Sequence, residues 1–287
     1  MRALLRHLPY LLRQTVLSAI DDELFRIAKG AAYSSILSFL PALTSAAAVL
    51  VATRAGFVSR YMTEFLSGVL PPGTDQLVLP SLHLKGSKPV LLLMLAATLS
   101  LWAASSVIKS LMEGFHAAYR TPRGRPFLRE TGVAIMLVLL AMLPIVGASA
   151  LILFGQQVEG AVLSALKVDP LLNPIAPLWE WLSRIARYLV AFLATVTLTA
   201  VLYYFGPNRP QRWARVWPGA TLATGLWLLT TVGFGFYVRN VANYGKLYGT
   251  VGTMMALVLW MYIIAAITLI GCEFNAEYER MLSMESA

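Results

Sequence analysis

The fold of this chain is decided by apolar stretches such as residues 247–272, which read LYGTVGTMMALVLWMYIIAAITLIGC. This stretch carries no charged side chain, and as an α-helix it would extend about 39 Å. The hydrocarbon core of a bilayer is about 30 Å thick, so the stretch is long enough to cross a membrane. The sequence therefore predicts a transmembrane helix here.

Five further stretches are equally free of charge. All six are 19 to 27 residues long, and the other five are residues 30–53, 89–108, 132–158, 188–206 and 216–238. Charged residues make up 13% of the 287-residue chain, against about 25% in soluble proteins. The pattern predicts an all-α, polytopic integral membrane protein with six transmembrane helices and interfacial amphipathic helices. The expected division is an amphipathic N-terminal segment (1–29), a transmembrane domain (30–272) and an acidic tail (273–287).

The basic residues predict the orientation of the chain. With the N-terminus inside, 14 of the 23 lysines and arginines fall in cytoplasmic segments, three of them in the short loop 207–215. Lysine and arginine accumulate in cytoplasmic loops, so we expect both termini in the cytoplasm. The same rule accounts for the net charge of +9, and we expect no nucleic-acid partner.

The N-terminal residues favour an interfacial helix over a cleavable signal peptide. Arg6, Pro9 and Arg13 interrupt the apolar run that a signal peptide needs. The single cysteine, Cys272, excludes an intramolecular disulfide, and we expect it to be a small buried apolar residue.

A polar stripe follows the first predicted span. Ser34, Ser38, Pro41 and Ser45 recur at helical spacing, so they share one helix face. Pro41 removes a backbone hydrogen bond and is expected to kink the helix. The stripe is either a seam against a neighbouring helix or the wall of a polar cavity on a substrate path.

Two groups of polar residues near the span ends are further candidates for a substrate path. The end of the second span carries Lys109, Glu113 and His116 on one helix face. Lys109 and Glu113 form either a solvated helix pair or part of a functional site. Outside the membrane, Arg239, Asn243 and Lys246 would share a face if the fifth helix continues. Such basic residues could hold phosphate headgroups, although each alone is more often a topology or snorkelling charge.

Several short motifs resemble the YihY/BrkB-like family of bacterial inner-membrane proteins. The resemblance extends from about Asp22 to Arg280, with Gly206 and Cys272 as departures from the usual residues. The motifs are YFGPNR (204–209), WPGA (217–220), FYV (236–238), NY (243–244), YGTVG (248–252), GCEFNA (271–276), AAY (31–33) and SFLP (38–41), with Ser105 and the loop 120–129 in comparable places.

The resemblance implies a six-span protein of the bacterial inner membrane. Labels in the family include a serum-resistance virulence factor and a ribonuclease, and some members are linked to export of lipid A precursors or other envelope lipids. No catalytic residues carry over from it to this chain.

Three functions follow as hypotheses, led by a carrier or flippase for an anionic phospholipid, a lipid A precursor or another envelope amphiphile. A scaffold without transport, which could act as a homo-oligomer, is the alternative. A nuclease is disfavoured because His7, His83 and His116 are dispersed, and the sequence has no metal-ligand cluster and no Gly-x-Ser-x-Gly motif. We therefore expect no enzymatic activity, no metal and no cofactor.

Overall fold

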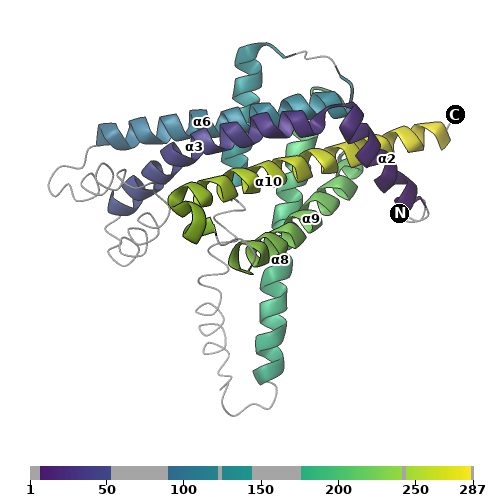
Figure 1. Ribbon diagram of the computed structural model, residues 1–287. Helices are drawn as coiled ribbons and strands as arrows, with labels where there is room; N and C mark the ends of the chain where they lie inside the picture. Colours follow the sequence, from purple (N-terminus) through teal and green to yellow (C-terminus); the bar gives the residue numbers. More distant parts are fainter. Residues whose placement is uncertain (1–6, 53–89, 122–124, 144–175, 241–243, 286–287) are drawn as a thin grey trace.

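A computed structural model describes residues 7–52, 90–121, 125–143, 176–240 and 244–285 of the chain (Figure 1). Every regular element among these residues is a helix, which confirms the predicted all-α class. The elements are α2 (Leu8–Asp21), α3 (Leu24–Ala52), α6 (Val90–Ala118), a helix over residues 127–143, α8 (Ala176–Phe205), α9 (Trp213–Asn240) and α10 (Tyr244–Glu285).

Three of these helices are long and apolar enough to cross a membrane. They are Ile185–Phe205 in α8, Trp213–Tyr237 in α9 and Met254–Met284 in α10, which match the last three predicted spans. The first three predicted spans extend into residues that the structure does not describe, and their described parts are helical in α3, α6 and residues 127–143. The interfacial helix expected after the first span also lies outside the described residues.

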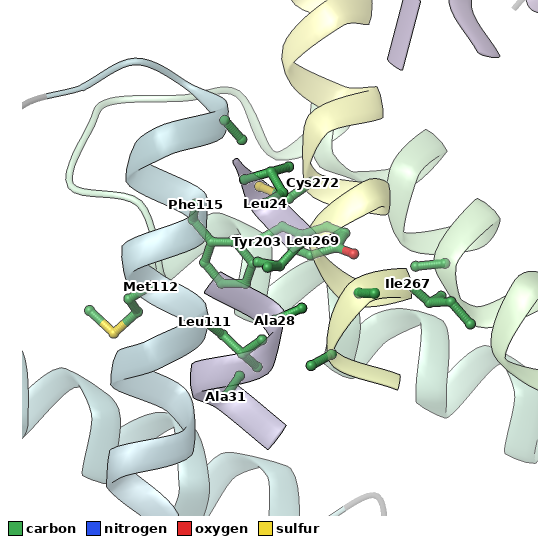
Figure 2. Close-up of a cluster of buried hydrophobic side chains, with 14 of the residues drawn as sticks. Leu24, Ala28, Ala31, Leu111, Met112, Phe115, Tyr203, Ile267, Leu269 and Cys272 are labelled. Carbon is green, nitrogen blue, oxygen red and sulfur yellow. The ribbon is translucent and has the colours of Figure 1, made fainter. Parts of the chain in front are cut away.

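The helix packing is organised around α10. Helices α3 and α6 lie alongside each other, and α10 packs against both of them as well as against α2 and α9 (Figure 1). Figure 2 shows side chains of α3, α6 and α10 converging around Tyr203 of α8, whose ring meets that of Phe115 edge-on at 5.6 Å. Tyr203 is fully buried, and its hydroxyl donates a hydrogen bond to the carbonyl of Thr268 at 2.6 Å. This core also contains Cys272, which is buried as predicted.

Glycines bring α9 and α10 into direct backbone contact. A Cβ atom added at Gly219 would lie 2.0 Å from the carbonyl oxygen of Gly271, so neither position tolerates a side chain without movement. From the sequence, Gly219, Ala223, Gly225, Gly233 and Gly235 of the fifth predicted span would each allow a close backbone approach. This expectation holds at Gly219, whereas a Cβ at Gly225 or Gly233 would meet nothing within 4 Å.

Two helices end at residues in the left-handed region. Glu23 after α2 has φ 54°, and Arg120 after α6 has φ 51°. The amide of Arg120 donates to the carbonyl of Ala117, and that of Thr121 to the carbonyl of His116, both at 2.9 Å. These bonds form a Schellman motif, which satisfies carbonyls left free at the end of α6. The motif fixes the direction in which the chain leaves the bundle.

The outer faces of the helices are apolar. Leu229 and Val232 of α9 are 71% and 72% exposed, and Leu193 of α8 and Leu99 of α6 are also exposed. Exposed apolar surface of this extent on long helices fits contact with lipid rather than with water. The membrane is therefore the main solvent of this protein.

Candidate functional site: a polar cluster at one end of the bundle

Charged and polar side chains gather where α10 continues beyond its apolar part. Glu273, Asn275 and Glu277 are buried. Glu277 is bonded to α2, Asn275 is bonded to the start of α9, and the neighbouring Arg280 reaches the end of α6. We call this group the polar cluster. Its members are Ser18, Asp22, His116, Tyr119, Arg120, Asn208, Arg209, Arg215, Glu273, Asn275, Glu277, Glu279 and Arg280.

Arg280 links three elements of the polar cluster. Its guanidinium group pairs with Glu277 and, at 3.3 Å, with Glu273, and it donates to the carbonyl of Ala118 at 2.6 Å. The hydroxyl of Ser18 donates to the same Glu277 carboxylate at 2.6 Å. Arg280 thereby joins α10 to the end of α6 directly, and to α2 through Glu277.

Glu273 is the most deeply buried carboxylate of the polar cluster. Its Oε1 faces Arg280, while its Oε2 accepts no hydrogen bond from any described residue. A buried carboxylate with an unsatisfied oxygen has a large desolvation cost. Glu273 also lies in the segment Met254–Met284, which is long and apolar enough to cross a membrane. An ionisable residue inside a transmembrane helix is by default a candidate functional residue.

A second ion-pair group lies beside the first. Glu279 accepts from Arg209 at 2.5 Å and from Arg215 at 2.7 Å, one guanidinium at each oxygen. The guanidinium carbon of Arg209 lies 4.3 Å from the centre of the Tyr119 ring, a cation–π contact. Burial, followed by nearby negative charge, raises the pKa of the Tyr119 hydroxyl well above its usual range, so Tyr119 stays neutral.

The side chain of Asn275 forms two hydrogen bonds with the backbone at the start of α9. Its Oδ1 accepts from the amide of Gly219 at 2.7 Å, and its Nδ2 donates to the carbonyl of Val216 at 3.0 Å. Pro218 lies between these two residues and cannot donate a backbone hydrogen bond. The motifs WPGA (217–220) and GCEFNA (271–276), far apart in the sequence, therefore meet at one helix crossing.

The α8–α9 connection is held by hydrogen bonds from Gln211, which belongs to it, and from Arg125, which precedes the helix over residues 127–143. Gln211 donates to the carbonyls of Tyr203 and Tyr204 at 2.6 and 2.7 Å, and Arg125 donates to those of residues 205, 206 and 207. These donors satisfy carbonyls that the last turn of α8 leaves free. The amide of Asn208 donates to Nε2 of His116 at 3.3 Å, which attaches the connection to α6.

The predicted stripe of the first span lies against α6. The hydroxyl oxygens of Ser34 and Ser110 are 3.2 Å apart, and Ser100 donates to the carbonyl of Pro41 at 2.6 Å. The hydroxyl of Ser38 donates to the carbonyl of Ser35 within α3, and the side chain of Ser45 lies outside the described part. This placement favours the seam interpretation, and a role of these residues in transport stays a prediction.

Among the other predicted site residues, His116 belongs to the polar cluster, whereas Lys109, Glu113, Arg239, Asn243 and Lys246 are not among its members. The ammonium group of Lys109 lies 5.2 Å from the centre of the Phe127 ring, and Glu113 is exposed on α6. The structure does not describe the side chains of Arg239 and Lys246, nor any part of Asn243. Their role as a substrate path therefore also stays a prediction.

The sequence analysis assigned Glu273, Glu277 and Arg280 to a cytoplasmic tail and did not propose them as a site. A signal for the site was present, because Arg280 follows Glu277 by three residues and Glu273 by seven. On a helix this spacing places one base and two acids on a single face. Such a pattern directly after an apolar run indicates a continued helix with a buried polar face.

Comparison with known proteins shows the family of the chain. The sequence profile described as Virulence factor BrkB matches residues 16–286, which is nearly the whole chain. The chain belongs to the virulence factor BrkB family. The resemblance inferred from the motifs is thereby confirmed, and both motifs that meet at Asn275 lie within the matched region.

Several curated proteins of this kind are similar to the chain. A UPF0761 membrane protein of Tolumonas auensis is 26% identical over 263 residues, covering 89% of this chain and 80% of that protein. One from Chromobacterium violaceum is 25% identical over 271 residues, covering 88% and 58%. YfkH of Bacillus subtilis (strain 168), named a ribonuclease-like protein, is 27% identical over 177 residues, covering 62% of each chain. The chain thus spans less than two thirds of the length of two of these three relatives. No solved structure matches this chain.

Proposed function

We propose that this BrkB-family protein is a carrier or flippase for an anionic lipid or a related envelope amphiphile. The observation that carries the proposal is the largely buried group of Glu273, Glu277 and Arg280 in a helix that is long and apolar enough to span a membrane. Burying ionised groups in an apolar bundle is costly, and in membrane proteins such groups mark substrate or ion pathways. A protein that only filled the membrane would be more stable with apolar residues at these positions.

The proposed orientation is six crossings of the bacterial inner membrane with both termini in the cytoplasm. It is supported by the hydrogen bond that Ser18 of α2 donates to Glu277 of α10, a contact expected if the two ends of the chain lie on one side of the membrane. An even number of crossings has the same consequence. The excess of lysine and arginine in the predicted cytoplasmic segments assigns that side.

A non-enzymatic role is part of the proposal, as is the absence of a cofactor. The name ribonuclease-like belongs to YfkH and states nothing about the chemistry of this chain. Among the described residues, no group of three or more His, Cys, Asp and Glu side chains lies close enough to hold a metal ion. A nuclease assay of the purified protein tests this part of the proposal.

Proteoliposomes test the transport itself. The protein is reconstituted with headgroup-labelled phosphatidylglycerol, a labelled lipid A precursor or labelled phosphatidylcholine, and movement between leaflets is compared with protein-free vesicles. We expect movement of the anionic lipids that Glu273→Gln abolishes and that Asp21→Asn, an exposed carboxylate in α2, leaves unchanged. Equal movement with and without folded protein would contradict the proposal.

A non-transporting scaffold is the second candidate, favoured by one observation. Gly225 and Gly233 of α9 are exposed and face open space, so a second helix could approach the backbone there. Cross-linking in membranes tests this function. A dimer that disappears in the Gly225→Leu, Gly233→Leu variant, together with absent lipid movement, would favour the scaffold.

A further inference from the structure

Positive charge exceeds negative charge at the start of α9. Arg209 and Arg215 share one carboxylate, that of Glu279, and Arg212 between them is exposed. The first turn of α9 has no acidic residue, although the positive end of a helix dipole favours one there. Two guanidinium groups thus share a single carboxylate, and the exposed Arg212 adds a third positive charge in the same short segment, so that the local excess of positive charge attracts a further anion.

The Glu279 carboxylate shows how Arg209 and Arg215 can hold an anion between them. Each of its oxygens accepts from a different arginine, an arrangement that phosphate oxygens can also adopt. The side chains of Arg209 and Arg215 are 24% and 34% exposed, so an anion can reach them from outside. The Tyr119 ring orients Arg209 independently of Glu279, which keeps the guanidinium in place if the carboxylate moves away.

Aromatic residues next to the arginines indicate the depth of a lipid headgroup. Trp213 meets Tyr204 edge-on at 5.2 Å and Trp217 at 5.8 Å, and Trp213 is exposed. Tryptophan and tyrosine concentrate at the membrane–water interface, where the phosphates of the lipids lie. Basic pockets between transmembrane helices bind anionic headgroups at that level.

We propose that Arg209, Arg212 and Arg215 bind the phosphate of an anionic lipid headgroup, and that the lipid displaces Glu279 from the first and last of them. The role of this site rests on the proposed transport function. Its existence does not, because a lipid can bind there even if the protein does not move it. Glu279 holds the two arginines in position when no lipid is present. Binding then exchanges an internal carboxylate for an external phosphate.

Removal of the internal carboxylate gives the sharpest test. The full chain in uncharged detergent is titrated with short-chain phosphatidylglycerol, short-chain phosphatidylcholine and inorganic phosphate, and the dissociation constants are compared. We expect Glu279→Gln to bind phosphatidylglycerol about five- to tenfold more tightly, because the competing charge is gone. Arg212→Gln should weaken that binding about as much, whereas Arg129→Gln, an exposed arginine in the helix 127–143, should change it less than twofold.

Two results would overturn the site. The first is a folded Glu279→Gln protein whose affinity for phosphatidylglycerol is unchanged or lower. The second is unchanged affinity in the Arg212→Gln variant. This variant tests the site even if the Glu279→Gln protein fails to fold. Equal affinity for inorganic phosphate and phosphatidylglycerol would overturn the lipid assignment. Binding that responds as expected without lipid movement would refute only the transport function.

Discussion

Replacing Gly219 by alanine should destabilise the protein, whereas the same change at Gly225 on the same helix should not. A Cβ at Gly219 would lie 2.0 Å from the carbonyl oxygen of Gly271 and 2.6 Å from the side chain of Asn275. Real Cβ contacts stay beyond about 3 Å, so α9 and α10 must separate by about 1 Å at their crossing. Because protein interiors are close-packed, neighbouring contacts cannot absorb that movement without loss.

The two substitutions should change the free energy of unfolding in opposite directions. Overpacking of this kind costs about 1–3 kcal/mol, and here the obstructing atom belongs to the backbone of Gly271. At Gly225 the added methyl group meets nothing within 4 Å, so only helix propensity acts, and alanine is favoured by about 0.5–1 kcal/mol. For a chain of this size, these energies correspond to a melting temperature lower by about 3–9 °C for Gly219→Ala and higher by about 1–3 °C for Gly225→Ala.

Thermal unfolding of the purified full chain, followed by tryptophan fluorescence in one detergent, measures both variants against the unchanged protein. The Gly225→Ala variant controls for the general effect of alanine in α9. A Gly219→Ala protein that melts at or above the temperature of the unchanged protein would refute the close crossing. It would also remove the basis for placing Asn275 and the polar cluster against α9.

Three further predictions concern buried polar groups and use the same unfolding assay. Asn275→Leu removes two buried hydrogen bonds and should lower stability by about 2 kcal/mol, at about 1 kcal/mol for each bond; an unchanged melting temperature would argue against these two bonds. Arg280→Met leaves Glu273 and Glu277 buried without their base and should cost about 3–5 kcal/mol. The triple variant with Gln at both glutamate positions should recover most of that loss, and no recovery would mean that Arg280 acts through packing alone. Tyr203→Phe removes one buried bond and should cost about 1 kcal/mol, so a loss of 3 kcal/mol or more would point to a wider role of the hydroxyl.

The apolar runs predicted the helices well because hydrophobic length is a direct consequence of bilayer thickness. The runs at residues 188–206, 216–238 and 247–272 overlap α8, α9 and α10, although α8 begins earlier, at Ala176, and α10 continues to Glu285. The end of α10 was not predicted, since charge at Glu273 and Glu277 looked like the start of a solvated tail. These carboxylates are buried because Arg280 and Ser18 pair with them, and such pairing is invisible in a hydropathy pattern.

The contacts between distant segments could not be predicted from the sequence. The spacing of the first-span serines predicts a shared face, but it does not predict that Ser34 faces Ser110 of α6. The loop arginines Arg209 and Arg215 were interpreted as a topology signal, which explains their charge without revealing Glu279 as their partner. Periodicity specifies which residues share a face of one helix, whereas the partner of that face depends on the tertiary packing.

We expect the buried carboxyl group of Glu273 to serve the movement of an anionic lipid. The most direct test is translocation of headgroup-labelled phosphatidylglycerol in proteoliposomes containing the unchanged protein, Glu273→Gln or Asp21→Asn, with folding verified for each. The account predicts protein-dependent movement that is lost with Glu273→Gln and kept with Asp21→Asn. Lipid movement that persists unchanged in Glu273→Gln, or that is absent with all three folded proteins, would contradict it.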